Sequence, residues 1–165
     1  MAIARTLRHL FATRAGTRRR FTDVVDASIE SAIRAAETRS SGEIRFVIET
    51  ALDLRELWGA VTPRARALQV FSALGVWDTE LRNGVLIYVL AADRDVEIVA
   101  DRGAATRISP IEWESACKLI EDHFRAGRFR EGSVAGVEEV GRLLEREFPV
   151  RPGDRDELPN QASLL

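Results

Sequence analysis

The chain has 165 residues, with 26 acidic and 24 basic side chains and a formal net charge of −2. A chain of this length is expected to fold as one domain around a single core. No apolar run reaches the roughly 18 residues that a transmembrane helix needs, so no transmembrane helix is expected. The only cysteine, Cys117, excludes an internal disulfide and indicates a reducing compartment. These features predict a soluble cytoplasmic protein.

The charges are unevenly distributed, because residues 1–20 hold six arginines and no acid. The rest of the chain has 18 basic against 26 acidic side chains, a charge of −8. On a helix, the apolar side chains of the first segment would lie together, surrounded by arginines: Ile3, Leu7, Leu10 and Phe11, with Arg5, Arg8 and Arg14. We predict either an amphipathic helix, peripheral on an anionic inner-membrane surface, or a disordered basic tail. Nucleic acid is not an expected partner, because the remainder is acidic.

The core elements begin with a helix that Thr22 can cap and that Ser40-Ser41-Gly42 ends. Its apolar positions recur at helical spacing: Val25, Ile29, Ala32, Ile33 and Ala36. Residues 44–49 then alternate between apolar and charged side chains, a pattern typical of a strand. Residues 51–61 are expected to form a loop. Thr62-Pro63 begins the next helix, which Gly75 ends.

The clearest local pattern lies between residues 76 and 103. Residues 85–90 form an unbroken apolar run, typical of a strand that is buried on both faces. Residues 95–101 alternate, and Ala92, Asp93 and Arg94 between the two runs predict a turn. We therefore predict a β-hairpin with Asn83 and Asp101 side by side at its open end and Asp93 at the other end.

Two further helices follow. Residues 109–112 form a capping box with proline at the first helical position, and this helix is expected to end at Gly127. A last helix is expected at residues 131–148, and residues 150–165 resemble a disordered tail. The order α-β-α-β-β-α-α predicts an α/β domain at residues 21–149. In it, a small mixed sheet that contains the hairpin has helices packed on its faces, as an α/β/α sandwich. The first two strands should be parallel, because a helix connects them.

Several short motifs occur in a characteristic order: Gly42, Trp77, Asn83-Gly84, Asp93-Arg94, Gly103 and FRAGRFREG at residues 124–132. With this order and spacing, residues 21–149 resemble the TPM-domain family. The family takes its name from a thylakoid lumen protein, a photosystem II repair protein and a nicotinic-receptor modulator. The resemblance implies that the domain binds a divalent metal, as some members do, or acts as a phosphatase, an activity ascribed to some members.

The predicted topology brings together oxygen-bearing side chains. If the first two strands are parallel and the third is antiparallel, then Glu43, Asn83 and Asp101 gather at one edge of the sheet. Asp78 and Glu80 lie on the loop that leads to this edge. Such oxygen ligands suit Ca²⁺ or Mg²⁺, so we predict a metal site at Glu43, Asp78, Glu80, Asn83 and Asp101. The alternative is turn and cap chemistry at Asn83 and Asp101, with solvated acids on the loop.

The predicted function is a TPM-like interaction or regulatory module with a protein partner of unknown identity, and the domain is expected to bind a divalent cation. A metal-dependent phosphatase is the alternative, and a metal-free binding module is a third. Asp93-Arg94-Asp95-Val96 also resembles the nucleophile motif of haloacid-dehalogenase phosphatases. The chain resumes as a strand at once, and no acidic pair follows a later apolar strand, so we expect Asp93 to be a turn residue.

Overall fold

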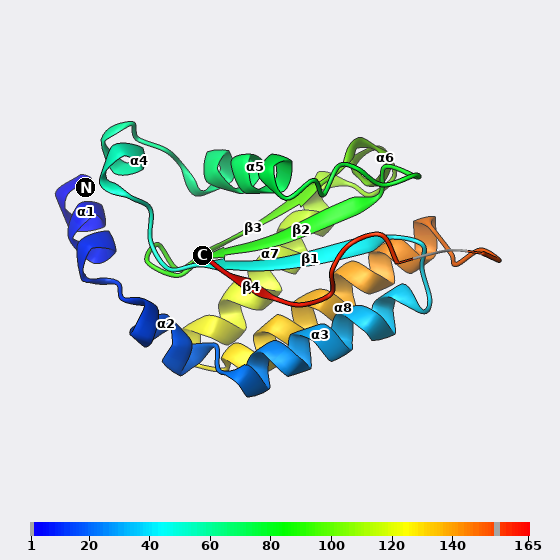
Figure 1. The fold of residues 1–165 in the computed structure, drawn as a ribbon, viewed down its shortest axis with the longest axis horizontal. Helices are drawn as coiled ribbons and strands as arrows, with labels where there is room; N and C mark the ends of the chain where they lie inside the picture. Colours follow the sequence, from blue (N-terminus) through cyan, green and yellow to red (C-terminus); the bar gives the residue numbers. More distant parts are fainter. Residues whose placement is uncertain (1, 154–155) are drawn as a thin grey trace.

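The computed structural model describes residues 2–153 and 156–165, and side chains from residue 4 onward, so the predicted place of Ile3 on the first helix lies outside the described side chains. Along the chain the elements are α1 (Ala2–Phe11), α2 (Arg14–Arg20), α3 (Asp23–Glu37), β1 (Glu43–Glu49), α4 (Leu54–Trp58), α5 (Pro63–Ala73), β2 (Gly84–Leu90), β3 (Asp95–Ala100), α6 (Arg102–Arg107), α7 (Pro110–Arg125), α8 (Phe129–Glu147) and β4 (Ser163–Leu164). In Figure 1 the sheet lies between α5 on one side and α3, α7 and α8 on the other. This arrangement confirms the predicted α/β fold.

The sheet is mixed, with the strand order β3-β2-β1-β4. β1 and β2 are parallel, and Glu43 lies opposite Gly84. β2 and β3 are antiparallel, and Val85 lies opposite Ala100. The starts of β1 and β2 and the end of β3 therefore meet at one edge of the sheet, as the sequence predicts.

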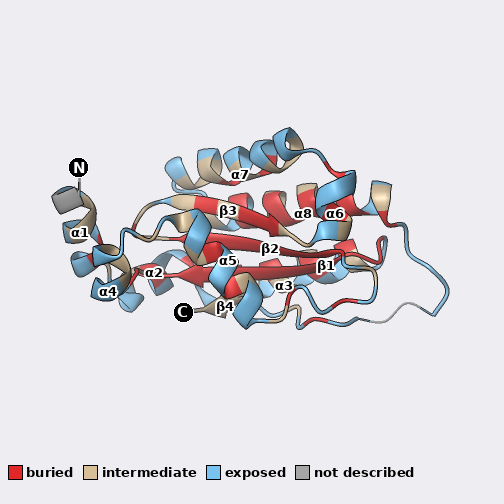
Figure 2. Cartoon of the chain, turned by 90° about the horizontal axis from the view of Figure 1, so that it is seen from above, coloured by how far each residue is buried: buried red, intermediate tan, exposed pale blue. Residues whose placement is uncertain are grey.

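The sheet is covered on both faces, as the buried strands in Figure 2 show. Ile44, Phe46 and Ile48 belong to the larger core cluster with α3, α7 and α8, whereas Val47 belongs to a second cluster with α5. All seven residues of β1 are buried. Three of them are charged: Glu43, Arg45 and Glu49. Buried charges need partners. Glu43 and Glu49, at the two ends of β1, therefore mark the places where a functional site is sought.

The Asn83-Gly84 pair begins β2 where two segments of backbone come together. A Cβ atom on residue 84 would lie 1.9 Å from the carbonyl oxygen of Val76, which only glycine avoids. The motif therefore has a steric role in bringing the loop before β2 close to the strand.

Two segments differ from the local predictions. The expected loop at residues 51–61 contains α4, which begins with a capping box formed by Asp53 and Glu56. The residues expected to close the hairpin also start α6, whose N-cap is Asp101. In both places a short helix follows a capping residue and has too few apolar positions to show helical periodicity.

The prediction of a disordered tail is wrong for residues 156–165. Leu158 is buried in the second core cluster, and β4 pairs with β1 in parallel. The buried guanidinium of Arg45 donates hydrogen bonds to the carbonyl oxygens of Pro159 and Gln161 and to the hydroxyl of Ser163. This segment covers the outer edge of β1, which would otherwise expose unpaired backbone groups.

The N-terminal segment is helical, and α1 is docked on the end of the sheet. His9 is buried, and its Nδ1 accepts a hydrogen bond of 2.9 Å from the backbone N–H of Leu52. Asp93, in the turn between β2 and β3, contacts Arg5 (2.8 Å), Arg8 (3.2 Å) and His9 (3.1 Å). These contacts exclude a wholly solvated tail. Among the described helices, none is both long and apolar enough to cross a membrane.

Candidate cation site at the start of the parallel strands

The edge of the sheet where the strand ends meet holds three of the residues predicted as ligands. Glu43 is buried, and its carboxylate accepts hydrogen bonds from the backbone N–H groups of Glu157 (3.2 Å) and Leu158 (3.0 Å). Asn83 is fully buried, and its amide donates a 2.6 Å hydrogen bond to the carbonyl oxygen of Ser41. Asp101 accepts a hydrogen bond from the N–H of Arg102, which caps α6.

The two acids on the leading loop are exposed. Asp78 uses its backbone N–H to bond the carbonyl oxygen of Gly75, and the N–H of Glu80 bonds the carboxylate of Glu157 at 3.2 Å. Of the five residues predicted from sequence, only Glu43 belongs to a group of carboxylates close enough to share an ion within the described residues. The metal assignment itself stays a prediction.

That group consists of Glu37, at the end of α3, Glu43, at the start of β1, and Asp156, in the C-terminal segment. Each offers an oxygen atom, and these atoms all lie within 4.8 Å of one another. Within the described part of the chain, none of the three is paired with a basic side chain within 4.0 Å. If all three carboxyl groups are ionised, three negative charges lie close together without a basic side chain of the described residues to balance them.

The surroundings favour protonated forms of two of these carboxyl groups. The pKa of Glu37 is raised to about 8, mainly by burial and also by the charges of Glu43 and Asp156, against the hydrogen bond from the backbone N–H of Ile44. Burial also raises the pKa of Glu43 to about 7, against hydrogen bonds from Glu157 and Leu158. Near neutral pH the cluster therefore holds a proton or requires a cation in its place.

Two oxygen atoms at this place are buried and have no hydrogen-bond partner among the described residues. They are Oε2 of Glu37 and Oδ1 of Asn160, whose amide nitrogen donates a 3.0 Å hydrogen bond to Asp156. An all-oxygen donor set with unpartnered oxygens is the chemistry that Ca²⁺ and Mg²⁺ prefer. The residues present thus fit a hard divalent cation.

A comparison with protein families matches residues 18–143 to the TPM domain. The chain belongs to the TPM-domain family. A search among curated proteins gave no match. Among solved structures, this TPM domain is similar to the BA42 protein of the psychrophilic bacterium Bizionia argentinensis, with 36% identity and a TM-score of 0.73. That alignment covers 87% of this chain and 94% of BA42.

A second solved structure shares the fold. It is the N-terminal domain of a P. gingivalis protein, with 22% identity, a TM-score of 0.57 and coverage of 77% of this chain and 78% of that one. Its similarity is evidence for the fold alone.

Sequence reasoning missed two members of the carboxylate cluster of this TPM domain. Glu37 lies at the end of a helix, where acids are commonly solvated, and Asp156 lies in a segment whose composition indicates disorder. A signal was present in Leu158, an apolar residue two positions after Asp156, but an isolated leucine does not predict docking.

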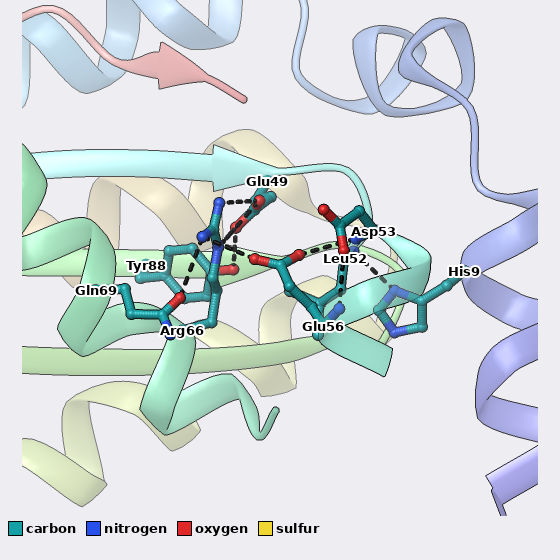
Figure 3. Close-up of polar contacts among 8 residues, drawn as sticks. All are labelled: His9, Glu49, Leu52, Asp53, Glu56, Arg66, Gln69 and Tyr88. Carbon is teal, nitrogen blue, oxygen red and sulfur yellow. Dashed lines mark hydrogen bonds and ion pairs between the residues drawn. The ribbon is translucent and has the colours of Figure 1, made fainter. Parts of the chain in front are cut away.

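The opposite end of β1 holds a buried polar network, which Figure 3 shows. The carboxylate of Glu49 accepts a 2.5 Å hydrogen bond from the hydroxyl of Tyr88. It also accepts hydrogen bonds from the guanidinium of Arg66, at 2.9 and 2.8 Å. Arg66 also contacts Glu56 at 2.8 Å. Burial raises the pKa of Tyr88, and its hydrogen bond to Glu49 adds to this effect. The network joins β1 and β2 to α4 and α5, so it holds the smaller layer on the sheet.

The Asp93-Arg94-Asp95-Val96 motif forms no phosphatase site. Hydrogen bonds from Arg5 and His9 lower the pKa of Asp93 against the effect of burial, and Asp95 belongs to β3. A carboxylate held by two arginines and an imidazole is a poor nucleophile, because these contacts stabilise its charge. Asp93 instead holds α1 against the turn between β2 and β3.

Proposed function

We propose that this TPM domain is an interaction or regulatory module that binds Ca²⁺ or Mg²⁺ through Glu37, Glu43 and Asp156. The observation that carries the proposal is the geometry of these three carboxylates, whose oxygens lie within 4.8 Å of one another. The neighbouring unpartnered oxygens of Glu37 and Asn160 support it, because a cation would satisfy them. A bound cation would supply positive charge to a cluster that has no basic partner among the described residues.

A cation at this cluster would also act on the C-terminal segment. Asp156 belongs to that segment, and Glu43 holds the segment through the N–H groups of Glu157 and Leu158. Binding would therefore stabilise the position of residues 156–165 along β1. This link between a small ion and a segment at the sheet edge is the basis for a regulatory role.

The test is a titration of the full-length, metal-free protein with CaCl₂ or MgCl₂, followed by calorimetry and by thermal unfolding. At a cation concentration 100 times Kd, binding to the native state should stabilise it by about 2.7 kcal/mol. For a domain of this size, that corresponds to a rise in Tm of about 5–10 °C. Asp156→Asn and Glu37→Gln should each remove most of the rise.

Asp78→Asn is the matched control, because Asp78 was predicted as a ligand from sequence but lies outside the cluster. It should leave the rise in Tm unchanged. If Asp78→Asn abolishes the rise and Asp156→Asn does not, the cluster assignment is wrong. If neither metal binds the wild-type protein at millimolar concentration, the proposed cation site is wrong.

Metal-dependent hydrolysis of a phosphomonoester is the second candidate function. The observation in its favour is the same cluster of carboxylates, Glu37, Glu43 and Asp156, which would hold the catalytic cation. A bound cation would supply charge stabilisation to a phosphoryl oxygen. The test is release of phosphate from a generic monoester with and without Mg²⁺. A cation-dependent rate that Glu37→Gln abolishes would support hydrolysis, and no rate above the buffer blank would exclude it for that substrate.

We also propose that α1 associates with anionic membrane surfaces. Its docked side carries His9 and the arginines that contact Asp93, while Leu7, Leu10 and Phe11 are 47%, 56% and 80% exposed. In Figure 1, α1 lies at one end of the molecule. Exposed apolar side chains beside arginines suit the interface of an anionic leaflet.

Sedimentation with vesicles tests this association. The protein should bind vesicles that contain anionic lipid at low salt, and Leu10→Ser should weaken binding. Ile111→Ser, which alters another exposed apolar residue, is the control. Equal effects of the two substitutions would contradict a specific role of α1.

A further inference from the structure

A cavity of about 460 Å³ lies where α7 ends and α8 begins, beside the end of β2. Three phenylalanines form its apolar wall: Phe21, Phe124 and Phe129. Their ring centroids lie 5.2 to 5.5 Å apart, and two of the three pairs meet edge to face. Phe21 is buried, whereas the other two rings are partly exposed. Interlocked rings give the cavity a rigid apolar surface that suits a ring or a short hydrocarbon chain.

The rim of the same cavity is positively charged. Arg20, Arg94 and Arg125 line it, against one acid, Glu121. Arg125 pairs with Asp122, but neither Arg20 nor Arg94 forms an ion pair within 4.0 Å with another described residue. The guanidinium of Arg20 instead lies over the ring of Phe129, 5.7 Å from its centroid. Two guanidinium groups are therefore available to an anion.

A smaller cavity of about 240 Å³ extends the charged rim toward α1. It shares Arg20, Ala91 and Arg94 with the first and adds Phe11 and Arg8, whose guanidinium pairs with Asp93. None of the residues that line it is acidic. Phe129 is also the first residue of α8, so the positive end of a 19-residue helix borders the first cavity.

We propose that this cavity binds a small organic anion that joins one phosphate, phosphonate or carboxylate group to an apolar ring or short chain. The apolar part lies against the three phenylalanines, and the anionic group meets Arg20 and Arg94. Guanidinium groups are well suited to such oxyanions, because they donate two parallel hydrogen bonds. The site lies at the carboxyl end of β2, whereas the carboxylate cluster lies at the amino end of β1, so the two sites are separate.

Calorimetric titration of the full-length protein with phenylphosphonate tests the proposal, with inorganic phosphate and benzyl alcohol as comparison probes. Phenylphosphonate should bind with a Kd at least about tenfold below that of either comparison probe, because each lacks one of the two recognised parts. Arg20→Gln and Arg94→Asn should each raise this Kd about tenfold. Asparagine suits residue 94, whose φ is +57°.

Arg19→Gln is the matched control, because Arg19 is the next residue on α2 and does not line the cavity. Phe129→Leu should weaken the binding of phenylphosphonate and leave the affinity for inorganic phosphate unchanged. Circular dichroism of each variant checks its fold. Because Arg20 is exposed, Arg20→Gln tests ligand binding without disturbing the packing of the core. The proposal is wrong if the wild-type protein binds phenylphosphonate no more tightly than phosphate. It is also wrong if Arg19→Gln and Arg20→Gln weaken binding equally.

A lipid head group and a free metabolite share this chemistry, so vesicles form the second arm. Phosphatidylcholine vesicles with and without phosphatidic acid are compared, using the same arginine variants. Binding to phosphatidic acid that Arg20→Gln and Arg94→Asn remove and that Arg19→Gln leaves intact would assign the ligand to a lipid. Binding of phenylphosphonate alone would assign it to a soluble anion.

Discussion

Without divalent cations, the stability of the domain should depend on pH through Glu37 and Glu43. Their pKa values are raised in the folded state to about 8 and about 7, from an ordinary value of 4.5. The folded state therefore keeps protons that the unfolded state releases above pH 4.5. The stability that these protons contribute is fully present below pH 4.5 and is lost as pH rises through 7 and then 8.

Burial is the largest cause of both raised pKa values, and repulsion within the cluster adds to it by an amount that follows from the distances. Two unit charges 4.8 Å apart repel by about 3 kcal/mol at an effective dielectric constant of about 20. A proton or a cation removes this repulsion. Loss of about 3 kcal/mol would lower the Tm of a domain of this size by about 6–12 °C. Because the cation replaces the proton, the rise in Tm that Ca²⁺ produces should grow as the pH increases.

Thermal unfolding of the full-length protein, measured in chelator and in millimolar CaCl₂ across this pH range, checks the reasoning. Glu37→Gln should remove the part of the pH dependence near pH 8 and keep the part near pH 7 that Glu43 contributes, because glutamine has no proton to lose. Asp78→Asn should keep the wild-type slope. If the wild-type protein and Glu37→Gln show the same slope, the carboxylate cluster does not control the stability.

Three other substitutions test the fold around the sites. Gly84→Ala should destabilise the protein by at least about 2 kcal/mol in urea, since its Cβ would lie 1.9 Å from the Val76 oxygen, and a loss below about 0.5 kcal/mol would contradict this packing. Tyr88→Phe should cost about 1.5–3 kcal/mol, because it removes a hydrogen bond to the buried carboxylate of Glu49, and unchanged stability would mean that the bond is dispensable. Asp93→Asn should speed tryptic cleavage within α1 while the urea midpoint of the core stays constant, and an unchanged cleavage rate would remove Asp93 as the anchor of α1.

The sequence is sufficient for the elements that carry strong local patterns. The hairpin of β2 and β3 follows from an apolar run, a turn and an alternating run, and the helices follow from caps and apolar periodicity. Asp93 lies in the turn as predicted, but the contacts that bring α1 to it have no local signal. Short helices such as α4 also have no local signal, because they have too few residues to show a period.

The candidate site was predicted only in part, because it depends on a contact between distant segments. The strand pattern places Glu43 at the correct edge, and the parallel pairing places Asn83 near it. Asp156 reaches the same edge only because Leu158 is buried and Arg45 holds the carbonyl groups of the following residues. A strand of two residues, such as β4, has no sequence pattern of its own.

Glu43 connects the candidate cation site with the C-terminal segment that pairs along the outer side of β1. Its carboxylate belongs to the cluster and also accepts the N–H groups of Glu157 and Leu158, while Asp156 lies next to them in the chain. A partner that adds a strand along the whole of β1 would have to displace β4 and also residues 156–162, which Glu43 and Arg45 hold beside the start of β1. A cation that stabilises the cluster therefore opposes such a partner, and by reciprocity the partner would weaken cation binding by the same factor. The edge of β1 is thus the surface on which a regulatory effect of the cation would act.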